Sequence, residues 1–327
     1  MTRGELLAVS AVAAAVVIIL VAVALVVTYR ARRAEATHPP AGRFVEVDGV
    51  RLHYVEAGVG TPVVLLHGNG TRAEDFRGSG VFDRLIASHR VVAFDRPGYG
   101  FSERPRGLRM WTPQRQAHLL VGALERLGIE QPVVVGHSWG TLVALALGLD
   151  HSERVRGLVL LSGYYYPTVR LDTLLFAPPA IPVLGDVMRY TISPLVGWLL
   201  MPWLLRQMFA PSPVPDSFRA AVPTELMLRP WQLRAGAAEA GLMVPAALRL
   251  RRRYGELRMP IRVIAGANDR VAHVQRHSVR FHRDVGSSDL SVIPELGHMV
   301  HYFAQDQVVE AVDGLSRPPQ HIGRRSA

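Results

Sequence analysis

Residues 133–149 read VVVGHSWGTLVALALGL, two apolar runs separated by a short segment with a serine at its centre. The first run is rich in valine and has the length of a strand, whereas the second has the length of a helix. We therefore expect a strand over 132–136, a turn over 136–140 and a helix over 139–149. A strand in a packed core has no need of a polar residue at that point, so the stretch indicates a chemical site.

The turn itself has the pattern G-x-S-x-G, with Gly136 and Gly140 on either side of Ser138. A sharp strand-to-helix turn leaves no space for a Cβ two residues before or after its centre, and it projects the serine hydroxyl from the edge of a sheet. The N-terminus of the following helix directs backbone N–H groups toward negative charge that develops there. These features are typical of a nucleophilic serine.

Short apolar runs alternate with helical stretches along most of the chain. The runs are nearly continuous in Val, Leu and Ile, as expected for strands buried on both faces of a parallel sheet. Residues 112–128 have apolar side chains at helical spacing, and residues 43–57, divided by Asp48-Gly49, alternate as in a β-hairpin. The sequence predicts an α/β fold with a mostly parallel central sheet and crossover helices. The strand candidates are residues 62–67, 90–95, 132–137, 157–162, 261–266 and 290–295.

The alternation stops over residues 164–257, which are rich in Pro, Leu, Met and Trp. We interpret this segment as an inserted helical lid whose helices are short and bounded by proline. It divides a core into residues 43–163 and 258–315, followed by a tail over 316–327.

The most apolar part of the lid, residues 174–209, allows two interpretations. It packs on the core and covers a pocket, or some of its side chains lie on a bilayer and admit lipid substrates. A second membrane span is disfavoured by Pro182, Pro194 and Pro202, which interrupt every window of the required length. The side chains in question are Trp198, Leu199, Leu200, Trp203 and Leu204.

The N-terminus carries a long uncharged segment. Residues 6–27 are 22 residues without a charge, and about 20 apolar residues span a bilayer as a helix. We predict an uncleaved single-pass anchor over 1–28 and a short polar linker over 29–42. A cleaved signal with a site at 34–36 and a buried core helix are the alternatives. The arginines that follow the span favour a cytoplasmic position for the globular domain.

Charge and cysteine usage exclude several kinds of site. The 37 basic residues are all arginine and the net charge is +10, which is compatible with attraction to anionic lipid headgroups. The dense basic run at 249–258 lacks a recognised motif and interleaved aromatic residues, so nucleic-acid binding is not predicted. The absence of cysteine excludes disulfides, thiolate metal sites and cysteine nucleophiles. No metal or organic cofactor is predicted.

Several short motifs follow the predicted strands in order. The motifs are HGNG at 67–70, DRPGYGFSERP at 95–105, GHSWG at 136–140, AGANDRV at 265–271 and ELGHMVH at 295–301. Jointly they resemble the α/β-hydrolase superfamily, in the broad group with a Ser-His-Asp triad. The resemblance covers roughly residues 43–165 and 258–312 and implies an α/β-hydrolase fold.

The resemblance implies a role for three side chains. Ser138 is the nucleophile, and because a hydroxyl is inert near pH 7 without a base, a histidine must take its proton. His298, after the last strand, is the implied base, with His301 as its nearest competitor. Asp269, at the end of a predicted strand, is the implied carboxylate that orients the imidazole. For Asp269 the alternative is a turn residue or helix cap.

Other motif residues have supporting roles. The resemblance implies an oxyanion hole formed by the backbone N–H groups of Asn69 and Trp139. We expect His67 and His137 to be structural. Asp95 and Arg96 are expected to brace the loop after the fourth strand rather than to act in catalysis.

We therefore expect a membrane-anchored serine hydrolase that cleaves a carboxylic ester through an acyl-enzyme. The apolar lid favours a lipophilic small-molecule ester. Epoxide hydrolases and haloalkane dehalogenases resemble the chain in the strand-four motif and the lid placement, but they use an aspartate nucleophile where this chain has Ser138. Carbon–carbon bond hydrolases, lactonases, perhydrolases and acyltransferases keep the serine and remain alternatives. A non-catalytic binding protein on the same fold is a further alternative.

Overall fold

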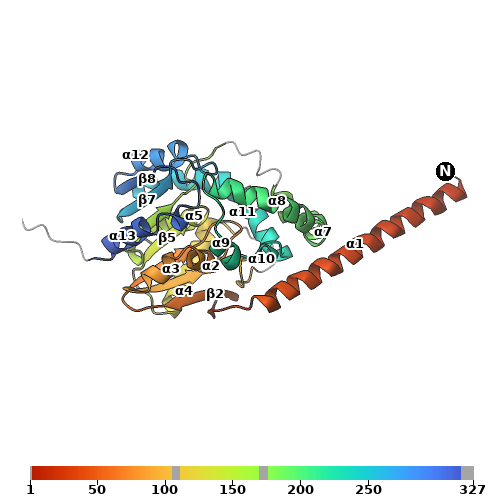
Figure 1. Ribbon diagram of the computed structural model, residues 1–327, viewed down its shortest axis with the longest axis horizontal. Coiled ribbons are helices and arrows are strands. Elements are labelled where there is room, and N and C mark those ends of the chain that lie inside the picture. Colours follow the sequence, from red (N-terminus) through yellow and green to blue (C-terminus); the bar gives the residue numbers. More distant parts are fainter. Residues whose placement is uncertain (1, 105–110, 169–175, 318–327) are drawn as a thin grey trace, which may run out of the picture.

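The computed structural model describes residues 2–104, 111–168 and 176–317. Within these ranges the strands form one eight-stranded sheet in the order β1-β2-β4-β3-β5-β6-β7-β8 (Figure 1). β2 is antiparallel to both of its neighbours, β1 and β4. The six strands β4, β3, β5, β6, β7 and β8 run parallel to one another. The strands are β1 (Arg43–Val47), β2 (Val50–Ala57), β3 (Thr61–Leu66), β4 (His89–Phe94), β5 (Val133–His137), β6 (Gly157–Leu161), β7 (Ile261–Gly266) and β8 (Ser288–Ile293).

The predicted fold class is confirmed, and each predicted strand has its counterpart in the sheet. β8 differs most, because it begins two residues before the expected 290–295 and is largely exposed rather than buried on both faces. The reason is its position at the edge of the sheet, where it pairs with β7 alone. The hairpin predicted over 43–57 is formed by β1 and β2.

Helices cover both faces of the sheet. Alternate side chains of each strand point to opposite faces, so Val64 and Leu66 join one core cluster while Val63 and Leu65 join the other. The first cluster includes helices α4, α5 and α12, and the second includes α2, α3 and α13. These helices are α2 (Glu74–Gly78), α3 (Val81–Leu85), α4 (Pro113–Arg126), α5 (Gly140–Asp150), α12 (Arg280–Asp284) and α13 (Gln305–Ser316).

The segment expected to be a lid, residues 164–257, is helical over most of its described part. The expectation of short helices is wrong, because α8 and α11 have 18 and 22 residues and contain Pro202 and Pro245 in their interiors. An interior proline removes one backbone hydrogen bond, and the burial of Met201, Leu205 and Phe209 on the lid's own core compensates for that loss. The helices are α7 (Leu184–Tyr190), α8 (Ile192–Phe209), α9 (Asp216–Ala221), α10 (Thr224–Met227) and α11 (Pro230–Arg251).

The N-terminal helix α1 (Arg3–Thr37) projects from the rest of the molecule (Figure 1). In the described part of the chain it is the one helix long and apolar enough to cross a membrane. It extends past the expected anchor, so most of the predicted linker, residues 29–42, is helical. Residues 30–37 are Arg, Ala, Glu and Thr, mostly good helix formers, and Pro39 then ends the helix. The predicted tail lies outside the described residues from 318 onward.

Candidate active site

Ser138 lies in the turn between β5 and α5, as predicted from the sequence. Its backbone φ is 52°, in the left-handed region that a residue with a side chain rarely adopts. The backbone N–H of Ser138 donates a hydrogen bond of 2.9 Å to the carbonyl of Leu161 at the end of β6, which supports the turn. Backbone strain of this kind concentrates at functional sites.

The two glycines around the serine are required by close backbone contacts. A Cβ at Gly136 would lie 2.7 Å from the carbonyl oxygen of Gly140, and a Cβ at Gly140 would lie 2.2 Å from the carbonyl oxygen of Leu66. Both distances are shorter than any real Cβ contact. The steric reason given for the G-x-S-x-G pattern therefore applies to this turn.

His298 connects the serine to a carboxylate. Its Nε2 lies 2.9 Å from the Oγ of Ser138, and its Nδ1 lies 2.8 Å from the Oδ2 of Asp269. Asp269 follows β7 and His298 follows β8, and both are buried. The other oxygen of Asp269 accepts hydrogen bonds of 2.8 Å from the backbone N–H groups of Val271 and Ala272. The three predicted side chains thus meet at the carboxyl edge of the sheet.

The contact with Asp269 determines which nitrogen of the His298 imidazole carries the proton. A carboxylate only accepts hydrogen bonds, so the Nδ1 of His298 carries the proton that Asp269 accepts. The Nε2 of His298 then presents a lone pair to the hydroxyl of Ser138. Such a group can remove the hydroxyl proton as the oxygen attacks an electrophile.

Of the two residues predicted to form the oxyanion hole, Trp139 directly follows Ser138 in the turn and Asn69 lies in the loop after β3, next to Gly68, where a Cβ would lie 3.2 Å from the Cβ of Ser138. The side chain of Asn69 donates to the carbonyl of Gly236, and the indole of Trp139 donates to the carbonyl of Glu239, so both side chains bind α11. Among the described residues, the backbone N–H groups of Asn69 and Trp139 have no hydrogen-bond acceptor. They are therefore available to an oxyanion.

His301, the competitor for the role of base, lies away from the serine. It is fully buried, and its Nε2 lies 3.3 Å from the Oδ2 of Asp75. The ring of His137 packs between His301 and His298, and its Nε2 donates to the backbone carbonyl of His298. Burial, together with the neighbouring His301 and His298, lowers the pKa of His137 well below its ordinary value. Neutral His137 supports the loop that carries His298.

Potential metal ligands gather behind the triad. In the described part of the chain, Asp75, His137 and His301 form the one group of three whose ligand atoms lie within 4.8 Å of one another. The Nε2 of His301 already contacts Asp75, and the Nε2 of His137 already donates to a carbonyl. The Nδ1 atoms of His137 and His301 are buried and have no hydrogen-bond partner among the described residues.

His67 is structural, as expected. Its Nδ1–H donates to the carbonyl of Gly68, while its Nε2 accepts the backbone N–H of Arg96. This pair of contacts needs a neutral ring with one donor and one acceptor. Burial, and secondarily the charge of Arg96, lowers the pKa of His67 to about 4.

Asp95 and Arg96 brace the loop after β4. Asp95 accepts hydrogen bonds from His53 and from the backbone N–H groups of Ala73 and Phe101. Burial opposes ionisation of Asp95, but the hydrogen bond from His53 and the nearby positive charges keep its pKa below the ordinary value.

Arg96 forms a fully buried ion pair with Glu239 of α11, which also accepts from Tyr99 and Gln116. The sequence analysis did not identify Glu239. One feature of the sequence could have identified it, namely that Glu239 is the single charged residue among the small apolar residues of 235–242. Because α11 carries Glu239 and also binds Asn69 and Trp139, this ion pair positions the lid helix over the candidate site.

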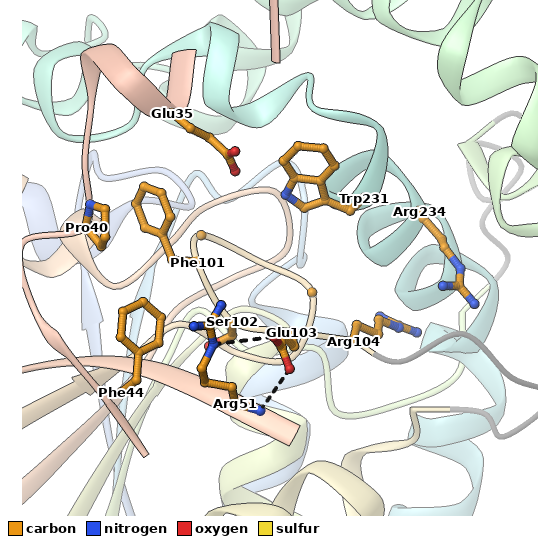
Figure 2. A pocket seen from close by; sticks show the side chains of 12 residues that line it. Glu35, Pro40, Phe44, Arg51, Phe101, Ser102, Glu103, Arg104, Trp231 and Arg234 are labelled. Carbon is orange, nitrogen blue, oxygen red and sulfur yellow. Dashed lines mark hydrogen bonds and ion pairs between the residues drawn. The ribbon is translucent and has the colours of Figure 1, made fainter. Parts of the chain in front are cut away.

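A cavity of about 480 Å³ lies beside the end of α1 (Figure 2). Glu35 of α1, the loop after β4 and the first turns of α11 form its walls, and no triad residue lines it. Arg51 and Glu103 pair within it, as Figure 2 shows. A second cavity, of about 250 Å³, adjoins Asp269.

Comparisons with known proteins identify the fold family. Residues 61–305 match the family model for the alpha/beta hydrolase fold. The chain is 39% identical over 139 residues to 2-hydroxymuconate semialdehyde hydrolase of Pseudomonas putida, covering 41% of this chain and 49% of that protein. It is 40% identical over 125 residues to Epoxide hydrolase A of Mycobacterium tuberculosis (strain ATCC 25618 / H37Rv), covering 38% of each. The match thus spans about half or less of the length of these curated relatives.

Solved structures resemble the fold over more of the chain. The structure of Cfl2 from Burkholderia cenocepacia matches with a TM-score of 0.69 and 26% identity, covering 84% of this chain and 95% of that one. The family match covers well over half of the chain, and the sheet and the serine turn agree with it. The chain therefore belongs to the α/β-hydrolase fold family.

Proposed function

We propose that this protein is a serine hydrolase that acts through an acyl-enzyme. The observation that carries the proposal is the position of His298, whose two ring nitrogens lie 2.9 Å from Ser138 and 2.8 Å from Asp269. The left-handed backbone at Ser138 and the two unpaired amides beside it support the same assignment. In this assignment Ser138 is the nucleophile, His298 the base and Asp269 the orienting acid.

The reaction follows from these contacts. The Oγ of Ser138 attacks the substrate carbonyl as its proton passes to the Nε2 of His298, and Asp269 stabilises the resulting imidazolium. The backbone N–H groups of Asn69 and Trp139 stabilise the oxyanion of the tetrahedral intermediate. His298 then protonates the departing alkoxide, which leaves an acyl ester on Ser138. Water attacks this ester as it gives a proton to His298, and His298 then passes that proton to the Oγ of Ser138 as the carboxylic acid leaves.

A lipophilic carboxylic ester is the substrate class that the lid supports best. The part of α11 that binds Asn69 and Trp139 carries small apolar residues around Glu239. Such surroundings contribute to binding by removing apolar substrate surface from water. An acyl or alkyl chain fits these surroundings better than a charged group does.

The protein is also proposed to be anchored in a membrane by residues 6–27 of α1, with the hydrolase domain in the cytoplasm. The length and apolar character of α1 support the anchor. The three arginines at positions 30, 32 and 33, directly after the apolar segment, support the cytoplasmic side. The proposed domain order is an anchor, a core in two parts and a lid inserted between them.

A carbon–carbon bond hydrolase is the second candidate. It is favoured by the similarity of this chain to two Pseudomonas proteins named 2-hydroxymuconate semialdehyde hydrolase, each 39% identical over the matched residues. The similarity to an epoxide hydrolase carries less weight, because the resemblance implies an aspartate nucleophile for that class and residue 138 is serine.

Labelling by a fluorophosphonate probe tests the nucleophile. The full chain in detergent is expected to be labelled, and Ser138→Ala is expected to lose the label entirely. Ser162→Ala is the matched control, because Ser162 follows the neighbouring strand β6, has a positive φ and is buried. Absence of label on the unmodified chain would favour a non-catalytic binding protein. Equal labelling of Ser138→Ala would remove Ser138 from its proposed role.

Substrate profiling separates the two candidate reactions. An ester hydrolase with a lipophilic preference is expected to show a kcat/KM that rises with acyl length across p-nitrophenyl esters. A carbon–carbon bond hydrolase is expected to act on a ring-fission-type dienoate at a rate far above its ester rate. A kcat/KM that stays flat with acyl length would contradict the lipophilic preference.

A further inference from the structure

The outer surface of the lid is strongly apolar. On α7 and α8, large apolar side chains face away from the core, and two of them, Trp198 and Leu199, are 68% and 72% exposed. Of the five side chains for which the sequence allowed two interpretations, Trp198, Leu199 and Trp203 are exposed, whereas Leu200 and Leu204 are partly buried. We call this surface the lid face, and its residues are Val187, Ile192, Leu195, Trp198, Leu199 and Trp203.

The opposite side of α8 accounts for the packing of that helix. Met201, Leu205 and Phe209 are buried against the lid's own core, together with Met299 beside the catalytic loop. Leu195, Leu199 and Trp203 follow one another at intervals of four residues and form a separate stripe, whereas Trp198 lies on the side of Met201 and Leu205 but is exposed. Because these side chains are more than half exposed, much of their apolar surface stays in contact with solvent. A contiguous exposed apolar patch of this kind marks an interaction surface.

The lid face lies beside the candidate membrane span. α1 packs against α10 and α7, and directly after its end His38 lies 3.1 Å from Glu225 of α10. Val27 of α1 is buried by this packing, and Val23 is partly buried. Both residues belong to the apolar segment 6–27, so the lid reaches the level of the proposed span. Figure 1 shows α7 and α8 on the side of the domain from which α1 projects.

Charges strengthen the case for a lipid partner. α8 has no acidic residue, and Arg206 near its end is exposed. The carboxylate of Asp186 on α7 is paired with Arg189. An apolar stripe with exposed tryptophans and a flanking arginine matches the boundary between hydrocarbon and headgroups, where tryptophan is enriched and arginine meets phosphates.

We propose that the lid face lies in the bilayer surface beside α1, in contact with lipid acyl chains, so that the protein meets the membrane at two places. The proposal rests on the membrane anchor stated under the proposed function. In this proposal the exposed side chains of α8 contact a lipid bilayer. The ion pair of 2.7 Å between Glu35 and Arg229 and the packing of α1 on α7 set the height of the lid relative to the span.

Site-specific fluorescence tests this contact on the full chain in phospholipid nanodiscs. The chain has no cysteine, so single variants can carry an environment-sensitive label at one position each. Leu199→Cys reports on the lid face and Ile18→Cys on the span. Val59→Cys is the matched control, because it is an apolar residue that is 83% exposed in the turn between β2 and β3, at the opposite edge of the sheet from the triad.

Two quenchers are compared, a nitroxide on the lipid acyl chain and iodide in the water. The lipid nitroxide is expected to reduce the fluorescence of the labels at 199 and 18 and to leave the label at 59 unchanged. Iodide is expected to quench the label at 59 alone. Retained fluorophosphonate labelling verifies that each variant is folded.

The other outcomes separate the two proposals. If the label at 18 is quenched by the lipid nitroxide but the label at 199 is quenched by iodide, the lid contact is overturned and the anchor stands. If the label at 18 is not quenched by lipid, the anchor itself is overturned. If the label at 199 is protected from iodide without being quenched by lipid, a second protein copy covers the lid face and the lipid contact is overturned.

Discussion

At the scale of single residues, the candidate site depends on hydrogen bonds that define which nitrogen of an imidazole carries a proton. The Oδ2 of Asp269 accepts from the Nδ1 of His298, so the Nε2 of His298 stays open toward Ser138. An amide in place of the carboxylate can donate as well as accept. It would therefore stabilise the tautomer whose Nε2 carries the proton.

Asp269→Asn is expected to lower kcat by about 10⁴-fold with little change in KM, because the substitution keeps the shape of the site but inverts the tautomer of His298. Steady-state kinetics on the best p-nitrophenyl ester measures the effect. Asp284→Asn, at a partly exposed carboxylate away from the triad, serves as the control and is expected to keep normal activity. Activity of Asp269→Asn within tenfold of the unmodified protein would contradict the role of Asp269.

Protonation of His67 is expected to lower the free energy of unfolding at acidic pH. Its pKa in the folded state, about 4, lies below the ordinary 6.5, so the unfolded state binds the proton more readily between those values. The stabilisation is therefore complete above about pH 6.5 and is lost as the pH falls toward 4. The loss amounts to about 3 kcal/mol in the free energy of unfolding.

His67→Gln keeps one donor and one acceptor but does not titrate, so its free energy of unfolding is expected to fall less between pH 7 and pH 4.5 than that of the unmodified protein. Denaturant unfolding in detergent at several pH values measures the difference. His118→Gln, at an exposed histidine, is expected to follow the unmodified protein. Parallel pH curves for His67→Gln and the unmodified protein would show that His67 does not titrate in this way.

At the scale of elements, the position of the lid over the core depends on a charge pair that crosses between them. Arg96 follows β4 and Glu239 lies in α11, and both side chains are fully buried. Breaking such a pair leaves one charge without a partner in a medium of low polarity. The guanidinium of Arg96 also donates to the carbonyls of His67 and Gly68, so the pair connects the lid to the strand-three loop.

Arg96→Met is expected to lower the free energy of unfolding by about 3–5 kcal/mol, because the carboxylate of Glu239 stays buried without its partner. Adding Glu239→Leu is expected to recover part of this loss. Arg253→Ala, which breaks a partly exposed pair with Asp150 and Glu256, is expected to cost about 0–1 kcal/mol. Chemical unfolding in detergent compares the variants, and equal losses for Arg96→Met and Arg253→Ala would contradict the argument.

At the scale of the whole molecule, α1 contacts the described part of the domain only near its C-terminal end. The buried residues of α1 are Val27, Ala31 and Ala34, spaced so that one stripe of the helix packs on the lid. The remaining surface of the apolar segment is exposed. A helix that is apolar on all sides and exposed over most of its length matches a membrane span rather than a core helix.

The full 36.0 kDa chain is expected to stay in the membrane fraction after washing with alkaline carbonate and to be released only by detergent, because removing a segment of 22 uncharged, mostly apolar residues from lipid is strongly unfavourable. Immunoblotting of an N-terminally and a C-terminally tagged protein measures this. A shorter C-terminal fragment in the soluble fraction, with the N-terminal tag lost, would identify the segment as a cleaved signal.

Local patterns of the sequence determined the elements of this protein and the chemistry of its serine turn. The Val-rich run before Gly136 and the apolar run after Gly140 predict a strand and a helix, because burial and spacing act over a few neighbouring residues. The order of Ser138, Asp269 and His298 along the chain agrees with the resemblance to α/β hydrolases. The 22 uncharged residues near the N-terminus are likewise visible in the chain itself.

Only the tertiary structure decided which distant residues meet and which surfaces remain uncovered. The pairing of Arg96 with Glu239 joins residues 143 positions apart, and no local pattern encodes a contact over that separation. The same holds for the exposure of Trp198 and Leu199, since the sequence shows that a residue is apolar but not whether another element covers it. The sequence predicted short helices bounded by proline, but α8 and α11 continue through Pro202 and Pro245. The packing of both helices outweighs the local cost of an interior proline.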